Sequence, residues 1–406
     1  MTQRLYYNEP YRRSFDAAIA TVEPGESPAE LVVTLDRTAF YPTSGGQPFD
    51  TGMLSGRRVT NVFDRDDDAI AHVIQATETG SAGLAPGTAV HGDIDWQRRF
   101  DHMQQHTGQH VLSAAFDRLF KVATVSFHLG AETSTIDLAR GVSASEIAAA
   151  EDEANRIVWE DRPVHIKYAD AEEAAALKLR KPSAREGTLR LIDVEGFDLS
   201  ACGGTHVSRT GGIGVIAVAS AEKFKGGQRL EFLCGGRALA RFRTLRDTAA
   251  AGVRLLSVLP SELPAAIERI QGEARDYKRS LTALQNELAG YRAGELAASA
   301  EPAGAVRLVA RALDADAGAL KALAAAVAGR SGHVAVLISA ARPSLAVVAR
   351  ASDVPLNAQQ VLSAMVQRFG GRGGGKPELA QGGGLDAAPE AILAFAREAI
   401  AGTSQA

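Results

Sequence analysis

Cysteine is scarce in this sequence, with two in 406 residues. A disulfide framework is therefore excluded, and a reducing compartment is expected. The sequence also contains no uncharged apolar run of the roughly 18 residues that a membrane-spanning helix needs. The N-terminal segment, MTQRLYYNEPYRRSF, lacks the apolar core of a secretory signal. These absences predict a cytoplasmic protein without a membrane partner.

An excess of positive charge is missing too. The chain has 44 Lys and Arg against 48 Asp and Glu, for a formal net charge of -4. Nucleic-acid-binding proteins are usually basic, because they must neutralise phosphates. The net charge therefore argues against a large non-specific nucleic-acid footprint. It does not exclude a local basic groove, since the electrostatic field at the binding face decides whether nucleic acid binds.

The length allows two to four domains, and the N-terminal half predicts an α+β fold in two parts. Residues 1–97 are expected to form a small β-barrel, with a curved sheet as the alternative. A strand is expected at 31–35, and Gly45 and Gly46 mark a turn. Residues 98–236 are expected to form an α+β domain. Its first helix covers about 101–119, a second is capped by Ser143 with Glu146 in a capping box, and strands follow at 192–194, 213–219 and 230–233.

Residues 237–300 predict a helical spacer. Apolar residues recur at helical spacing within 266–298, at Ile267, Ile270, Tyr277, Leu281, Leu284, Leu288 and Tyr291. Such a stripe fits half of a coiled coil and equally a helix lying on its own domain. A homodimer through the spacer or the C-terminal domain therefore stays open.

Residues 301–406 predict a C-terminal α/β domain. Strands are expected at 306–313, 334–338 and 345–348, and a helix capped by Asn357 follows. A glycine-rich segment at 369–384 separates this helix from a last one at about 388–400.

Histidine and cysteine spacing carries the clearest chemical signal. His106 and His110 lie four residues apart on the predicted helix, so both imidazoles share one face. Alone, such a pair is more often two unrelated histidines. Cys202 and His206 are also four apart and are separated by two glycines, which permit a tight turn. Together the four residues form a suitable set for Zn²⁺, and we predict them as the metal ligands and catalytic centre.

The alternative for Cys202 is a core thiol beside a solvent-facing histidine. His102, one helical turn before His106, is an exposed histidine, a group supporting the site or a substrate contact. Cys234 has no partner at ligand spacing and is expected in the core at a strand end.

These motifs match a known family. His106-Thr107-Gly108-Gln109-His110 and the segment from Ser200 to Val207 resemble the editing domain of alanyl-tRNA synthetase, and more closely the freestanding AlaX editing proteins. The segment from Phe40 to Pro48, with Asp50 and Gly52, resembles that family's glycine-rich motif. The segment from Phe369 to Gly384 resembles the DHHA1 domain. The resemblance implies the long type of AlaX, a zinc-dependent hydrolase whose partner is mischarged alanine tRNA.

Because the barrel begins within a few residues of Met1, we expect no aminoacylation domain before it. The implied enzyme removes serine or glycine from tRNA and attaches nothing. The sequence leaves open whether the zinc is catalytic or positions the substrate, because four protein ligands are usual for a structural zinc.

The resemblance and residue types also suggest substrate contacts. Gln109 stands where the synthetases often have threonine, which leaves the choice between serine and glycine open. Further candidates are Thr124 and Ser126 for the amino acid, Gly45, Gly46 and Gln47 for close backbone approach, and Arg185, Lys223 and Arg229 for phosphate or ribose. Ordinary strand polarity, a structural turn and solvated surface charge are the respective alternatives.

In the tail, we predict tRNA binding by Arg372, Gly373, Gly374, Gly375 and Lys376. Pro377 after Lys376 excludes a phosphate-binding P-loop of the nucleotide-hydrolase type. Two other functions remain: editing of another tRNA, as in the threonyl system, and a zinc-stabilised tRNA-binding module without catalysis.

Overall fold

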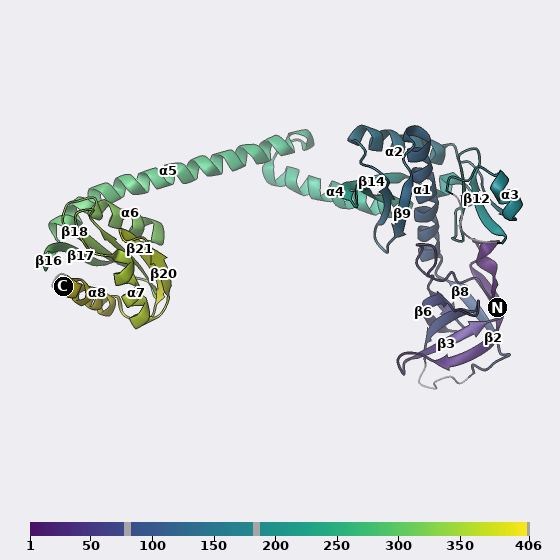
Figure 1. The fold of residues 1–406 in the computed structure, drawn as a ribbon, viewed down its shortest axis with the longest axis horizontal. Coiled ribbons are helices and arrows are strands. Elements are labelled where there is room, and N and C mark those ends of the chain that lie inside the picture. Colours follow the sequence, from purple (N-terminus) through teal and green to yellow (C-terminus); the bar gives the residue numbers. More distant parts are fainter. Residues whose placement is uncertain (77–82, 182–186, 404–406) are drawn as a thin grey trace. The chain divides into compact units, whose positions relative to one another are not determined.

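The computed structural model describes residues 1–76, 83–181 and 187–403. The chain divides into two compact units, Met1–Ala251 and Gly252–Ala406. Figure 1 shows the elements of each unit. Helix α4 (Gly235–Leu256) crosses the boundary between them.

A closed barrel occupies the start of the first unit, as the sequence predicts. Its strands follow one another around the barrel in the order β2 (Ser14–Pro24), β3 (Glu30–Leu35), β7 (Ile70–Gln75), β6 (Arg57–Asp64), β5 (Gly52–Leu54) and β8 (Ala89–Ile94). Short strands β1 (Gln3–Arg4) and β4 (Arg37–Thr38) pair beside it. Inward-facing residues such as Phe15, Val33, Leu54 and Ile74 fill the barrel core.

Two antiparallel sheets and two long helices follow. One sheet has the order β14 (Ile216–Phe224), β15 (Gly227–Cys234), β10 (Ser134–Leu138), β9 (Thr124–Leu129). The other consists of β11 (Val164–Ala169), β12 (Leu189–Val194) and β13 (Asp198–Ala201). The helices are α1 (Trp96–Phe120) and α2 (Ala144–Trp159), with the short α3 (Ala171–Ala176) after β11. Ser143 caps α2 in a capping box with Glu146, which confirms that prediction.

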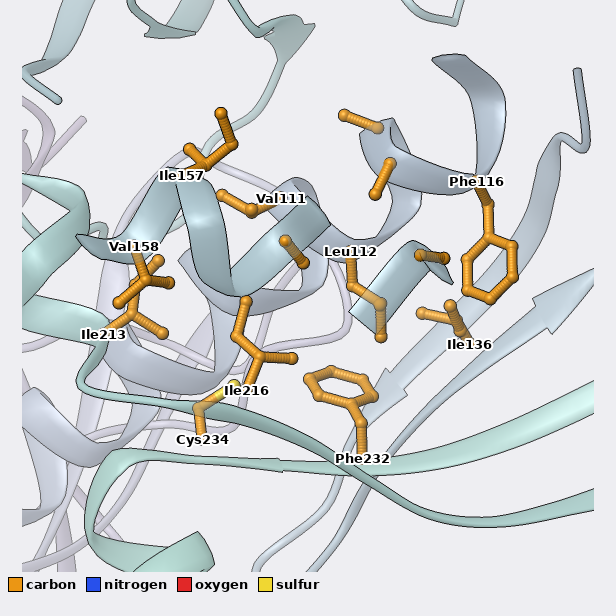
Figure 2. Packing of buried hydrophobic residues seen from close by; sticks show 14 of the residues in the cluster. Val111, Leu112, Phe116, Ile136, Ile157, Val158, Ile213, Ile216, Phe232 and Cys234 are labelled. Atoms are coloured by element: carbon orange, nitrogen blue, oxygen red, sulfur yellow. The ribbon is translucent and has the colours of Figure 1, made fainter. Parts of the chain in front are cut away.

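Helix α1 passes through the centre of this core. Val111, Leu112 and Phe116 on α1 pack with Ile157 of α2 and with Phe232 of β15, as Figure 2 shows. The buried thiol of Cys234 lies in the same cluster, as predicted, at the end of β15. Because α1 is held on so many sides, its polar residues have fixed positions.

Short 3-10 helices cover Leu5–Tyr7, Thr210–Ile213 and Pro260–Glu262. In the second unit, α5 (Leu263–Ala298) is a long helix that leads into an α/β domain. Within the described part of the chain, no single helix is long and apolar enough to cross a membrane. Only the bent pair Gly235–Leu256 and Pro260–Ala298 meets that test by length and composition.

The C-terminal domain is a six-stranded sheet between helices. Its strand order is β16 (Glu301–Ala303), β17 (Val306–Leu313), β18 (His333–Ser339), β19 (Ser344–Arg350), β21 (Leu379–Leu385), β20 (Arg372–Gly375). Helix α6 (Ala317–Ala328) packs with α5 on one face. Helices α7 (Ala358–Phe369) and α8 (Pro389–Thr403) pack on the other. Asn357 caps α7 as predicted.

The glycine-rich segment differs from a loop, because much of it forms the strand pair β20–β21. A side chain on Gly373 would place its Cβ 2.6 Å from the Cα of Gly382 on the facing strand. Glycine is therefore needed there for two backbones to approach closely.

Candidate metal centre and its pocket

Helix α1 carries two of the predicted ligands and is fastened to the barrel at its start. Asp95 caps it by accepting a hydrogen bond from the backbone N–H of Arg98. The guanidinium of Arg99 is fully buried and pairs with the buried carboxylate of Asp50, with Nε 3.0 Å from each carboxylate oxygen. Arg99 also donates to the carbonyl of Pro10. His106 and His110 follow about two and three turns after Arg99 along the same rigid helix.

The other two predicted ligands lie just beyond β13. The backbone N–H of Cys202 donates to the carbonyl of Arg190 at 3.0 Å. The Arg190 guanidinium donates in return to the carbonyls of Cys202 and Gly204, at 2.6 and 3.0 Å. A Cβ on Gly204 would lie 2.2 Å from Cε1 of His106. The glycine therefore lets this turn close against helix α1.

The fold brings these four side chains together. One ligand atom from each of His106, His110, Cys202 and His206 lies within 4.8 Å of all the others. The Sγ atom of Cys202 is 3.4 Å from Nε2 of His106 and 3.3 Å from Nε2 of His206. A nitrogen and a sulfur ligand of one tetrahedral zinc are about 3.5 Å apart. The donor types and spacing therefore fit a zinc ion.

Each imidazole is oriented by a hydrogen bond at its other nitrogen. The Nδ1 atoms lie 2.8 Å from Oε1 of Gln47 (His106), 3.0 Å from Oδ2 of Asp198 (His110) and 3.2 Å from Oγ1 of Thr107 (His206). The remaining nitrogen of each ring, Nε2, is thereby left for the centre of the cluster. Metal-binding histidines are usually held in this way.

Electrostatics favour the metal-binding forms of Cys202 and His206. Burial acts to raise the pKa of the Cys202 thiol, but His106 and His206 beside it lower that pKa well below its usual value. Burial lowers the pKa of His206 to about 3, which keeps that ring neutral. A thiolate and neutral imidazoles are the forms that bind a metal.

Asp198 supplies fixed negative charge behind His110. Burial opposes its ionisation, yet hydrogen bonding to His110 and the nearby Arg180 lower its pKa to about 2. Burial likewise acts against protonation of His110, but the hydrogen bond to Asp198 raises that pKa to about 9. The hydroxyl of Ser200 donates to the same carboxylate. Asp198 thus holds a proton on Nδ1 of His110.

A pocket of about 620 Å³ opens beside the cluster. His110 and Cys202 line it, as do five of the predicted substrate contacts: Gly45, Gly46, Gln109, Thr124 and Ser126. Cationic and aromatic side chains line it as well, including Arg180, Lys181, Arg190, Tyr7 and Tyr168. Such a pocket can accept a small polar group together with a larger anionic or aromatic one.

Three polar side chains form a chain at the pocket wall. The hydroxyl of Thr124 and the amide nitrogen of Gln109 both donate to Oγ of Ser113, at 2.8 and 2.9 Å. The amide oxygen of Gln109 is buried and has no hydrogen-bond partner among the described residues. An unpaired buried acceptor costs about 1–3 kcal/mol. A ligand that donates a hydrogen bond would relieve that cost.

The structure places some predicted contacts away from the pocket. Gln47 is fully buried behind His106, where it also accepts from the N–H of Thr205. Arg229 forms a bidentate pair with Asp137, and Lys223 is exposed on β14. Neither lines the pocket. Arg185 lies outside the described residues.

His102 is buried and lies outside the ligand cluster. Burial and the charges of Arg98 and Arg237 lower its pKa to about 3. Its Nδ1 atom has no hydrogen-bond partner among the residues described. The exposed-histidine interpretation of the sequence is therefore wrong for this residue, because helix α1 is covered on that side.

In the C-terminal domain, the predicted RNA-binding residues lie together at a sheet edge. Arg372, Gly373, Gly374 and Gly375 are exposed on the outermost strand, β20, and Lys376 follows them. Lys321 of α6 and Lys376 line a groove of about 430 Å³ beside this edge.

Several residues of the site were missed from the sequence, notably Asp198, Arg180, Ser113 and Arg190. Asp198 offered a usable signal, since it is an acidic residue four positions before Cys202 in the sequence. The others are ordinary polar residues whose partners are distant in the sequence.

Comparisons with known families agree with these features. The family described as threonyl and alanyl tRNA synthetase second additional domain matches residues 189–231, and the DHHA1 domain matches residues 305–402. The family described as tRNA synthetases class II (A) matches residues 13–98. The matched regions therefore place the chain in the class of proteins that share the second additional domain of threonyl and alanyl tRNA synthetases and the DHHA1 domain.

Full-length relatives identify the family. The chain is 30% identical over 407 residues to the alanyl-tRNA editing protein AlaX-L of Pyrococcus horikoshii, covering 98% of each chain. It belongs to the family of long alanyl-tRNA editing proteins.

The ligases themselves are longer. Identity is 33% to the alanine–tRNA ligase of Pyrococcus furiosus and 36% to that of Natronomonas pharaonis, of which 42% and 44% are covered. The chain thus spans less than half the length of these ligases. Among solved structures, the C-Ala domain of Aquifex aeolicus alanyl-tRNA synthetase matches 25% of this chain and 97% of that domain, at 22% identity and a TM-score of 0.24.

Proposed function

We propose that this protein hydrolyses the ester that joins serine or glycine to alanine tRNA, and that it does not attach alanine itself. The observation that carries the proposal is the four-residue N/S cluster opening into the polar pocket. The similarity to AlaX-L over 98% of both chains supports the same activity. The DHHA1 match favours alanine tRNA over the threonyl alternative.

We propose Zn²⁺ as the ion that fits the cluster. When bound, zinc polarises a carbonyl and lowers the pKa of water, which are the requirements of ester hydrolysis. Cys202 and His110 line the pocket, whereas His106 and His206 do not. The scissile ester therefore reaches the cluster from the side of Cys202 and His110. Gln47, Asp198 and Thr107 fix the orientation of the three imidazole rings through hydrogen bonds to Nδ1.

Selectivity would arise at the pocket wall. The unpaired amide oxygen of Gln109 can accept a hydrogen bond from the hydroxyl of serine. Alanine and glycine have no such donor and would leave the acceptor unpaired. The amide nitrogen already donates to Ser113, so the oxygen is the amide atom left for the substrate. We therefore propose serine as the better substrate, with the Thr124 hydroxyl holding Ser113 behind it.

The C-terminal domain would bind the body of the tRNA. The exposed glycine edge of β20 lets a phosphate backbone come close, and Arg372, Lys376 and Lys321 supply charge. Replacing Lys321 and Lys376 together by alanine should weaken tRNA binding and reduce its dependence on salt by about two units of slope.

The direct test mixes the zinc-loaded protein with alanine tRNA charged with serine, glycine or alanine, and follows amino-acid release. Serine-charged tRNA for threonine is assayed in parallel, and aminoacylation is assayed with ATP and alanine. We expect release of serine and glycine that spares alanine and is lost in His106→Ala. His91→Ala, an exposed histidine of the barrel, should be unaffected. Tight tRNA binding without release would instead support the binding-module alternative.

A further inference from the structure

The guanidinium of Arg190 has more hydrogen-bond donors than the protein uses. An arginine side chain carries five N–H groups. Nε donates to the carbonyl of Tyr7 at 3.0 Å, and Nη1 donates to the carbonyls of Cys202 and Gly204 at 2.6 and 3.0 Å. Nη2 is buried and has no hydrogen-bond partner within the described ranges of the chain. Three donors are therefore paired, and the two N–H groups of Nη2 are left over.

The paired donors hold the guanidinium in one place. All three acceptors are backbone carbonyls, which cannot rotate away as side chains can. The ring of Tyr7 lies beside the guanidinium, with its centroid 5.4 Å from Cζ of Arg190. Arg190 is buried and lines the pocket beside the metal cluster. Nη2 is thus the one guanidinium nitrogen that the backbone leaves available to a ligand.

The positive charge of Arg190 has no carboxylate partner either. Arg180 pairs with Asp198 and Arg229 pairs with Asp137, but in the described part of the chain no such ion pair includes Arg190. The described residues that line its pocket include no aspartate or glutamate. Burying a charge without a partner is costly. A ligand with a permanent negative charge supplies the partner that Arg190 lacks.

The pocket wall around Arg190 fits a nucleotide. Tyr168 lies opposite Arg190 on the neighbouring strand β11, and it lines the pocket together with Tyr7 and the exposed Lys181. Aromatic rings stack on bases, and arginine binds phosphate through charge-assisted hydrogen bonds. In a charged tRNA, the ester is on the ribose of the terminal adenosine, and the 5′-phosphate of that nucleotide is ionised. The ester carbonyl is neutral before the reaction, so it cannot compensate the charge of Arg190 in the bound substrate.

We propose that Arg190 binds the 5′-phosphate of the 3′-terminal nucleotide through Nη2. The same guanidinium donates to the carbonyls of Cys202 and Gly204, so it fixes the position of the phosphate relative to the metal-binding turn. The site thereby distinguishes an amino-acid ester on a nucleotide from a free amino-acid ester. The choice of ligand rests on the proposed hydrolysis of charged tRNA, whereas the phosphate site can be tested by binding alone.

Calorimetric titration of the zinc-loaded, full-length protein with 5′-AMP and with adenosine tests the phosphate site. We expect 5′-AMP to bind about 10- to 100-fold more tightly, as a hydrogen bond to a charged group predicts. Arg190→Met should reduce this ratio to about twofold or less. Arg162→Met is the matched control and should keep the ratio, because Arg162 pairs with Glu160 and does not line the pocket. Equal affinities of the unmodified protein for the two ligands would overturn the inference.

The ratio separates phosphate binding from the support that Arg190 gives to the Cys202 turn. A purely structural role would lower both affinities by the same factor, and an unchanged ratio in Arg190→Met would therefore refute the assignment. Competition with a zinc chelator checks that each variant still holds zinc.

Hydrolysis of serine esterified to the 3′-hydroxyl of AMP or of adenosine gives a second readout. We expect kcat/KM to be about 10- to 100-fold higher for the AMP ester, and Arg190→Met to remove this advantage. Equal losses of kcat on both esters would instead assign Arg190 to the ester oxyanion and overturn the inference. A protein that prefers 5′-AMP in the titration but hydrolyses neither ester would support the phosphate site and contradict the proposed function.

Discussion

Replacement of Asp198 by asparagine tests the hydrogen bond that supports His110, one of the proposed metal ligands. The carboxylate is fully buried, accepts from Nδ1 of His110 at 3.0 Å and pairs with Nε of Arg180 at 2.7 Å. Asparagine keeps the shape but has one acceptor oxygen. Either His110 or Arg180 must then face an amide N–H₂ group, and the guanidinium loses its counter-charge.

The magnitude follows from these two losses. Removing the partner that orients a metal-binding histidine typically weakens metal affinity 10- to 100-fold, or about 1.4–2.7 kcal/mol. Breaking a buried ion pair from one side costs a further 3–5 kcal/mol or so in folding free energy. We therefore expect Asp198→Asn to fold less stably, to bind zinc about 10- to 100-fold more weakly, and to lose hydrolysis in proportion to zinc occupancy.

Competition titration against a chromogenic zinc chelator measures the affinity, and urea unfolding measures the stability. Asp193→Asn is the matched control, because Asp193 lies on the neighbouring strand β12 and pairs with Lys167 near the surface. Such a pair contributes about 0–1 kcal/mol. If folded Asp198→Asn binds zinc as tightly as the unmodified protein, the carboxylate does not support His110 in the way described.

Three further changes test other parts of the molecule. Gln109→Met should lower kcat/KM for serine-charged tRNA about tenfold or more and change kcat/KM for glycine-charged tRNA by no more than about twofold. The reason is that methionine lacks the amide oxygen, and only serine has a hydroxyl that could donate to that oxygen. Equal losses for both substrates would contradict the selectivity proposal. Arg99→Leu should destabilise the protein by about 3–5 kcal/mol in urea unfolding by leaving Asp50 buried without a partner, and an unchanged midpoint would contradict this. Burial lowers the pKa of His72 from its usual 6.5 to about 4, so the unfolded chain binds a proton below pH 6.5 that the folded barrel does not. The free energy of unfolding should therefore fall by about 3 kcal/mol from pH 6.5 to 4 through this group, and His72→Gln should flatten that dependence.

Local patterns sufficed for most of the fold. Helix α1, the cap of α2 by Ser143 and the cap of α7 by Asn357 depend on residues close together in the sequence, and the structure has all three. Short strands and turn residues suggested a small barrel or a curved sheet, and the structure has a closed barrel. The glycine-rich segment was not predicted as strands, because glycine has low strand propensity and its pairing here depends on close approach to β21.

The four ligand residues were predicted from spacing, and the structure brings them together, whereas their supports could not be found in this way. Gln47, 59 residues before His106, was expected at the substrate and instead lies behind the histidine ring. Ser113 and Arg180 carry no motif at all. Such partners become visible only when the chain is folded, since hydrogen bonds between distant segments leave no periodicity in a sequence.

The buried ion pair between Arg99 and Asp50 fixes the position of helix α1 relative to the barrel. The barrel motif holds the helix start through Asp50, and it holds the first ligand ring through Gln47. A graft of residues 98–236 into another protein would therefore carry His106 without its Nδ1 partner and Arg99 with an uncompensated buried charge. The smallest transferable unit that keeps the histidine and cysteine cluster supported must include the barrel. A fusion or truncation of this protein should therefore be joined near the end of its first compact unit at Ala251.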